Sequence, residues 1–230
     1  MKRSAVLPLF LCLLVGFLVG GLLPMPWDRQ SVPSAPVLPD NFLSSNQSVG
    51  TQTNSSLSAG DSGDNLSLLT AAFTVANALR QEDFSTLASF VHPEKGVTFT
   101  PYSTVDFDSD LTFTQEQVME LSGNSTVYTW GTFDGRGDPI QMTAAEYFPR
   151  YVSNADYTKA PQIGIDHIMM RGNALENIDE AYPEGRFVDF CFPQQEQVNE
   201  GMDWCSLKLV FERRDASWLL VGIVHGEWTI

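Results

Sequence analysis

Basic side chains are scarce in this 230-residue sequence. It has 13 lysines and arginines against 28 aspartates and glutamates, which gives a formal net charge of −15 at pH 7. Lys2 and Arg3 stand at the start, so the remaining residues carry 11 basic against 28 acidic side chains, a net charge of −17. Nucleic acids bind proteins mainly through basic patches. We therefore exclude nucleic acid as a partner and interpret the acidic excess as a source of solubility, with cation binding as the lesser alternative.

Cysteine is equally scarce, with three residues in the whole chain. Cys12 lies inside a long apolar run, where a small apolar residue is its simplest role. Cys191 and Cys205 have no histidine or basic residue beside them in the sequence, and a reactive thiolate needs such a neighbour. The sequence therefore does not predict a catalytic cysteine.

The three histidines do not show the spacing of a metal site. His92, His167 and His225 are far apart in the chain, and neither an HxH nor an HExxH pattern is present. The sequence also contains no GxSxG nucleophile motif and no glycine-rich phosphate loop. It predicts neither a bound metal nor a cofactor.

Residues 1–23 are predicted to form an N-terminal transmembrane helix. From Ala5 to Leu23 the sequence contains no charged residue. As a helix this run would span about 28 Å, close to the ~30 Å hydrocarbon core of a bilayer. Lys2 and Arg3 then place the N-terminus in the cytoplasm and the rest of the protein outside. A secretory signal usually has an apolar region of only about 7–15 residues, so a retained anchor fits better than a cleaved signal, which remains the alternative.

Residues 24–63 are predicted to form a disordered tether. The first half contains repeated prolines, and the second half is mostly serine, asparagine, glycine, threonine and glutamine. Such a composition buries too little apolar surface to offset the entropy lost on folding. We expect a flexible spacer between the membrane and a folded domain.

Residues 64–230 are predicted to form a globular α+β domain. Two amphipathic stretches, which begin near Asp64 and near Gln81, predict a pair of helices. We expect these helices to pack on one face of a curved, mainly antiparallel sheet. The last third contains three β-rich runs that predict an antiparallel meander: Phe187 to Phe192, Trp204 to Arg213 and Trp218 to Trp228.

This order of elements, with the short acidic turn Arg80 to Phe84 between the helices, resembles the nuclear transport factor 2-like (cystatin-like) roll. Separately, four segments resemble a family of uncharacterised bacterial membrane-anchored or secreted envelope proteins: Phe90 to Val97, Trp130 to Gly135, Gly201 to Trp204 and Val221 to Ile230. The second resemblance implies an envelope location but brings no known activity. The roll hosts enzymes, carriers and adaptors alike, so it does not select a function.

The cysteines of the predicted meander are candidates for a disulfide. If its first two runs pair symmetrically about Val198, Cys191 lies opposite Cys205 and Asp189 lies opposite Leu207. An oxidising exterior would permit a bridge there, and two buried thiols are the alternative.

A carboxylate in an apolar cavity of the roll would have a raised pKa suited to acid–base chemistry. Asp189 is the first candidate. His225 and Glu227 are its candidate partners, and these two point to the same side because residues two apart on a strand share a face. The weaker candidates are two tyrosine donors, Tyr102 and Tyr128, and two further carboxylates, Asp106 and Asp166.

The absence of a catalytic motif favours a membrane-tethered, extracytoplasmic accessory domain. Its partner would be an unknown protein or small molecule outside the membrane, and the membrane itself would be contacted through the N-terminal helix. The alternative is a small isomerase- or hydratase-like enzyme that uses a carboxylate in the cavity of the roll.

Overall fold

The computed structural model describes residues 59–194 and 202–229. The chain divides into two units, Met1–Thr53 and Asn54–Ile230, and the described residues all belong to the second. The predicted anchor and nearly all of the predicted tether lie outside them. Among the described residues, no helix has both the length and the apolar character needed to cross a membrane.

The domain begins with two consecutive helices, α1 (Ala59–Gln81) and α2 (Phe84–Phe90). The chain turns between them at Glu82, which has a positive φ of 54°. Asp83 then caps α2, because its carboxylate accepts a hydrogen bond from the Thr86 N–H at 3.0 Å. The predicted helix pair is confirmed, although α1 starts five residues before Asp64.

The apolar spacing of the sequence predicts that α1 buries Leu66, Leu69, Phe73, Ala76 and Leu79, and the structure fully buries only Ala76 and Leu79 of these. Small and medium residues such as Leu68, Ala72 and Val75 are fully buried, whereas Leu66 is 67% exposed. Phe73 is half-buried and meets Phe190 of the sheet edge-to-face at 5.2 Å. The buried face of α1 is therefore rotated from the predicted stripe and overlaps it at Ala76 and Leu79.

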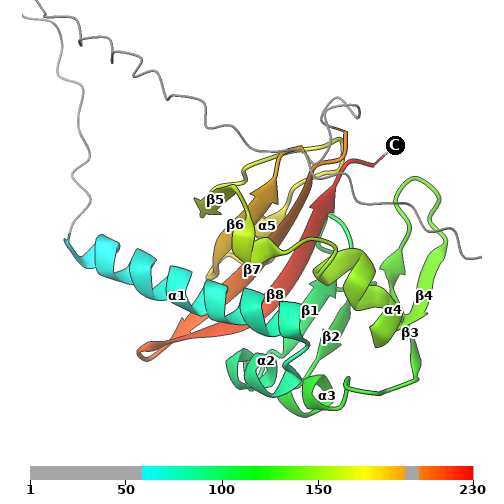
Figure 1. Ribbon diagram of the computed structural model, residues 1–230, viewed down its shortest axis with the longest axis horizontal. Helices are drawn as coiled ribbons and strands as arrows, with labels where there is room; N and C mark the ends of the chain where they lie inside the picture. Colours follow the sequence, from blue (N-terminus) through cyan, green and yellow to red (C-terminus); the bar gives the residue numbers. More distant parts are fainter. Residues whose placement is uncertain (1–58, 195–201, 230) are drawn as a thin grey trace, which may run out of the picture. The chain divides into compact units, whose positions relative to one another are not determined.

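Six strands form the main sheet, in the order β2-β1-β8-β7-β6-β5, and two form a separate hairpin (Figure 1). Strand β1 pairs with β8 in parallel, and every other neighbouring pair is antiparallel. The sheet strands are β1 (Val97–Thr100), β2 (Leu111–Phe113), β5 (Gln162–Ile165), β6 (Arg186–Phe192), β7 (Cys205–Arg214) and β8 (Ser217–Glu227); the hairpin is β3 (Val127–Thr132) with β4 (Pro139–Thr143). The predicted α+β class and the C-terminal meander are both confirmed.

Short helices fill the connections between the strands. A capping box at Thr114 starts the helix that follows β2, and a similar box at Thr143 starts the one that follows β4. In chain order these helices are α3 (Gln115–Met119), α4 (Ala144–Tyr147) with a π-helical turn (Phe148–Val152), a 3-10 turn (Tyr157–Lys159) and α5 (Ile178–Ala181).

The register of β6 with β7 corrects the predicted cysteine pairing. Cys191 lies opposite Ser206, and Cys205 lies opposite Phe192, one residue away from the predicted alignment. Successive strand residues point to opposite faces, so this shift puts the two cysteines on different sides of the sheet. Both are buried thiols, and they form no disulfide with each other. Neither the long connection nor the apolar pattern of these strands predicts the register, because both of their faces are buried.

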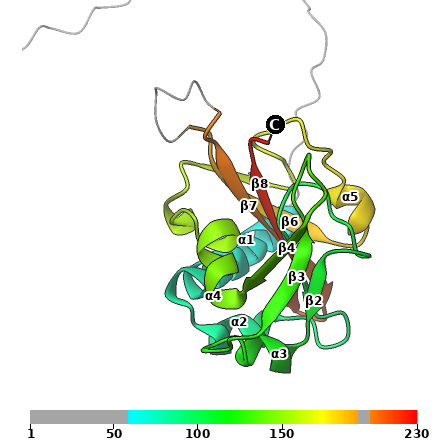
Figure 2. The same cartoon turned by 90° about the vertical axis from the view of Figure 1, so that its right-hand side faces the viewer.

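The two faces of the sheet carry different covers, α1 on one side and α5 on the other (Figures 1 and 2). We call the first side the helix face. It packs a large cluster that includes Phe99, Phe190, Leu207 and Ile223 against α1 and α4. We call the second side the strap face, because residues 166–182, the strap, cross it. Its smaller cluster is Val105, Ile178, Tyr182, Phe187, Val210, Val221 and Val224.

A buried ion pair fastens the strap to the sheet. Lys208 of β7 donates a hydrogen bond from Nζ to Glu176 Oε1 at 3.2 Å, and the two side chains are 0% and 2% exposed. Asp189 of β6 lies opposite Lys208 of β7 and accepts a hydrogen bond from the Met169 N–H at 2.8 Å. Each charged sheet residue thus holds a different point of the strap.

Removing the Lys208 charge should strongly destabilise the domain. In Lys208→Met, Glu176 and Asp189 would lose their buried counter-charge, and we expect the free energy of unfolding to fall by about 3–5 kcal/mol. Denaturant unfolding at pH 7 measures this. The matched control is Lys95→Met, which breaks a half-exposed pair with Glu212 and should cost at most about 1 kcal/mol. Equal stability of the two variants would contradict the anchoring role of Lys208.

Candidate functional site

A cavity of about 410 Å³ opens where β1 ends and the β3–β4 hairpin turns. One wall is the chain that follows β1, including Tyr102 and Asp110. The other is the hairpin turn, including Phe133 and Asp134. The full lining is Pro101, Tyr102, Thr104, Asp106, Ser109, Asp110, Thr132, Phe133, Asp134, Gly135, Gly137 and Ala174.

Asp110 is the half-buried carboxylate of this cavity, whereas Asp106 and Asp134 are exposed. Its Oδ2 accepts hydrogen bonds from the Thr100 hydroxyl at 2.6 Å and from the Asp106 N–H at 3.0 Å. Burial raises the pKa of Asp110 to about 6, the two hydrogen bonds oppose that rise, and the nearby Asp106 charge adds to it. Asp110 therefore changes its charge close to neutral pH.

The cavity wall is rich in groups that accept hydrogen bonds. Asp106, Asp110 and Asp134 supply three carboxylates, and Tyr102, Thr104, Ser109 and Thr132 supply hydroxyls. Among the described residues that line the cavity, none is lysine, arginine or histidine. Arg136 lies nearby, with its guanidinium carbon 4.6 Å from the centre of the Phe133 ring. The electrostatic character of the wall is therefore negative.

Aromatic rings support the cavity from the helix face. Tyr102 meets Tyr151 edge-to-face at 5.9 Å, and Tyr151 in turn meets Tyr147 at 4.9 Å. Tyr147 stacks on Trp130 at 3.8 Å with nearly parallel rings. Burial raises the pKa of both Tyr147 and Tyr151, so both phenols keep their protons at neutral pH.

His225 and Glu227 share the helix face but do not line this cavity. His225 is 1% exposed, and its Nδ1 lies 3.0 Å from the Pro101 carbonyl oxygen, to which it donates when that nitrogen carries the proton. Burial lowers the pKa of His225 to about 4, so the ring is neutral at pH 7. Glu227 accepts two hydrogen bonds from Arg150, at 2.9 and 2.5 Å. These contacts explain both residues as parts of the fold.

Asp189 lies on the opposite side of the sheet from His225 and Glu227. It faces Lys208 across the strands instead of Leu207, because the register differs by one residue from the predicted one. Burial raises the pKa of Asp189, while the Lys208 charge acts in the opposite direction. The structure therefore does not bring the three predicted acid–base residues together.

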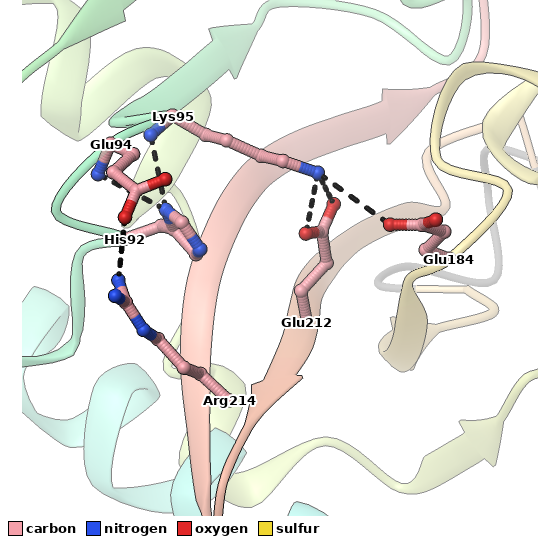
Figure 3. Close-up of polar contacts among 6 residues, drawn as sticks. All are labelled: His92, Glu94, Lys95, Glu184, Glu212 and Arg214. Carbon is pink, nitrogen blue, oxygen red and sulfur yellow. Dashed lines mark hydrogen bonds and ion pairs between the residues drawn. The ribbon is translucent and has the colours of Figure 1, made fainter.

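The remaining predicted candidates are spread over the domain. Asp166 pairs with Arg186 at 2.6 Å, and Tyr128 accepts a hydrogen bond from the Asn124 side-chain amide at 3.0 Å. His92 accepts the Lys95 N–H through Nδ1 at 3.0 Å, which orders the turn before β1 (Figure 3). The described residues include no cluster of three or more histidine, cysteine, aspartate or glutamate side chains that could hold a metal ion.

Two of the weaker sequence candidates, Tyr102 and Asp106, do line the cavity. Sequence reasoning missed Asp110, which has the most informative pKa shift there. The alternation of Asp106, Asp108 and Asp110 was a signal, because three acidic residues at every second position are unusual in so short a segment. Asp106 and Asp108 are exposed and Asp110 is half-buried. The burial of Asp110 depends on the β3–β4 hairpin, which is distant in sequence, so no local pattern reveals it.

Comparisons with known proteins give no family assignment. No family model matches this chain, and no curated protein matches it. Similar solved structures include an NTF2-like family protein from Streptomyces avermitilis, with 12% identity over 74% of this chain and 99% of that one at a TM-score of 0.35. An NTF2-like protein of unknown function from Shewanella oneidensis matches with 7% identity, 71% and 99% coverage and a TM-score of 0.29.

The CaMKII hub homology domain from Chlamydamonas reinhardtii is similar at 14% identity, 72% and 99% coverage and a TM-score of 0.30. The first two of these structures belong to the NTF2-like class that the order of elements resembles. All three TM-scores lie below 0.5, so no argument about the site rests on these likenesses.

Asp110 should titrate near pH 6, as measured by carboxyl carbon NMR. The pKa in the folded state lies above the ordinary value of 3.8, so the folded state binds more protons than the unfolded state between about pH 4 and pH 6. The contribution of Asp110 to stability therefore falls as the pH rises through that window. Asp110→Asn should remove this fall from the unfolding free energy.

The matched control is Asp134→Asn, which changes another carboxylate of the same cavity and should leave the fall between pH 4 and 6 in place. A midpoint for Asp110 near its ordinary value would show that the carboxylate is solvated, and would contradict this description of the cavity.

Proposed function

We propose that this protein is a membrane-tethered, extracytoplasmic ligand-binding domain, and that the Asp110 cavity binds a small organic cation. The observation that carries the proposal is the lining of the cavity, which offers three carboxylates, four hydroxyls and no basic side chain. A cation in this cavity would pair with Asp110 and Asp106, whose charges already act on each other.

The aromatic residues of the cavity support the same class of ligand. Tyr102 and Phe133 both line it, and ring faces attract ammonium groups, most strongly when water is excluded. The net charge of −17 beyond Arg3 also favours the approach of cations over anions. A cationic group with a short hydroxylated arm would use the carboxylates, the rings and the hydroxyls together.

A cation and the Asp110 proton should compete for the same carboxylate. Choline is a suitable probe, and its uncharged isostere 3,3-dimethyl-1-butanol is the matched ligand control. We expect the affinity for choline to rise by up to about tenfold between pH 5 and pH 7, as Asp110 with its pKa of about 6 ionises. Calorimetric titration of the full chain in mild detergent measures this.

In Asp110→Asn the affinity for choline at pH 7 should fall about tenfold and lose its pH dependence, because the carboxylate that attracts the quaternary ammonium is gone; tenfold corresponds to about 1.4 kcal/mol. Tighter binding of the uncharged isostere, or unchanged choline binding in Asp110→Asn, would rule out the cation site.

A second candidate function is acid–base catalysis in the same cavity. The observation that favours it is the pKa of about 6 for Asp110, because a general base works best when its pKa lies near the working pH. Tyr102 lines the same cavity and would be the proton donor of an isomerase- or hydratase-like reaction. Turnover with a pH profile that has an inflection near 6, lost in Asp110→Asn, would favour this alternative over binding alone.

The membrane setting rests on the sequence of the first 23 residues and on the resemblance to envelope proteins. We expect the full chain to sediment with membranes, and its C-terminal domain to be digested by protease added to spheroplasts or intact cells from outside. Leu14→Arg puts a charge in the middle of the apolar run and should move protein out of the membrane fraction, because such a charge costs about 3 kcal/mol there. Leu14→Ala is the matched control. Intact, protease-resistant protein in the cytosol would disprove this placement.

A further inference from the structure

A second, smaller cavity of about 190 Å³ lies on the strap face, beside the pairing of β1 with β2. Tyr182, at the end of α5, and Phe107, on the chain between β1 and β2, cover it. Its floor is sheet, from Thr98 to Val221. The complete lining is Lys95, Thr98, Phe107, Thr112, Ala181, Tyr182, Glu212 and Val221.

Tyr182 lines this cavity, and its hydroxyl is buried without a hydrogen-bond partner among the described residues. Tyr182 is 6% exposed, and its hydroxyl lies over Gly222, where a Cβ atom would come within 2.6 Å of it. Burial raises the pKa of Tyr182, and the nearby Thr98 hydroxyl opposes that rise without forming a well-directed hydrogen bond. A buried hydroxyl left unpaired is costly, and native proteins rarely keep one without a use.

The other polar groups of the cavity already have partners. The Thr98 and Thr112 hydroxyls lie 2.8 Å apart. At the rim, Lys95 donates hydrogen bonds to both carboxylate oxygens of Glu212, at 2.8 and 2.6 Å, and Glu184 lies 4.0 Å from the same ammonium (Figure 3). Tyr182 is thus the polar group whose hydrogen-bonding capacity is left for a ligand.

We propose that this strap-face cavity is a second ligand site, which binds a small uncharged molecule through a hydrogen bond to the Tyr182 hydroxyl. The ligand supplies a carbonyl or hydroxyl oxygen to Tyr182 and places a short apolar body between Phe107, Ala181 and Val221. This proposal does not depend on the function of the Asp110 cavity.

Size and charge define the class of ligand. The cavity has the volume of on the order of six water molecules at ~30 Å³ each, which suits a compound of about five to eight heavy atoms. An anion would meet Glu212 at the rim, and a cation would meet Lys95, so neither sign of charge is favoured. An uncharged amide with a short branched chain fits these limits.

The chain from Ser103 to Asp110 separates the two sites. Phe107 covers the strap-face cavity, while Asp106 and Asp110 line the other one. The two sites therefore share one wall but no lining residue. Asp110→Asn should leave the strap-face site intact, which makes failure of one proposal distinguishable from failure of the other.

The test uses isobutyramide as the probe, with isobutyrate and isobutylammonium as its charged analogues. We expect saturable amide chemical-shift changes at Thr98, Tyr182 and Val221 of the full chain in detergent, with an apparent Kd in the millimolar range expected for six heavy atoms. Both charged analogues should bind at least several-fold more weakly. A lack of saturable shifts, or tighter binding of isobutyrate or isobutylammonium, would overturn the proposal.

Tyr182→Phe gives two readouts of opposite sign. It should raise the midpoint temperature of unfolding, because the unpaired hydroxyl is removed, and weaken isobutyramide binding about tenfold, because one hydrogen bond is lost. The matched control is Tyr157→Phe. Tyr157 is equally buried, but its hydroxyl donates to Asn154 Oδ1 at 2.8 Å, so this variant should melt lower and bind isobutyramide normally.

Val221→Ile provides an independent check, since an added methylene fills the cavity without touching the Tyr182 hydroxyl. It should weaken isobutyramide binding. Unchanged binding would show that isobutyramide binds outside the strap-face cavity, and would refute the proposed site. Unchanged binding in Tyr182→Phe would likewise refute the assigned hydrogen bond.

Discussion

Strands β7 and β8 are buried on both faces, and the rest of the domain is arranged around this constraint. A sheet buried on both faces needs a cover on each side, and here the second cover is a mostly irregular strap that contains only the short helix α5. Such a strap has many polar backbone groups and little apolar surface, so specific contacts must hold it. The pair between Lys208 and Glu176 and the hydrogen bond from Met169 to Asp189 supply them. Buried charge, usually a liability, thus has a structural purpose in this fold.

Both proposed sites lie where this covering ends. The Asp110 cavity opens beyond the end of β1, where the sheet gives way to the β3–β4 hairpin, and the Tyr182 cavity lies beside edge strand β2. Their chemistry differs because their walls differ. The first wall comes from acidic turns and carries three carboxylates, whereas the second comes from sheet and strap and has one unpaired hydroxyl. His225 and Asp189 are too deeply enclosed to take either role.

The sequence predicted the class of the fold better than the site. Apolar periodicity located the helix pair and the three-stranded meander, because burial leaves a local pattern. It could not fix the register of β6 with β7, because the long connection imposes no alignment and both faces of the strands are apolar. The true register, shifted by one residue, places Cys191 and Cys205 on different faces of the sheet. It also places Asp189 on the face opposite to His225 and Glu227. Asp110 was missed because its raised pKa depends on a hairpin that is distant in sequence.

The proposed binding function depends on whether an organic cation enters the Asp110 cavity. A crystal structure of the protein with choline at pH 7.5 tests this most directly. The account predicts an ammonium group among Asp110, Asp106 and Asp134, with Tyr102 or Phe133 against its methyl groups. Choline bound at another surface while this cavity holds only water, or a cavity closed by Arg136, would contradict it.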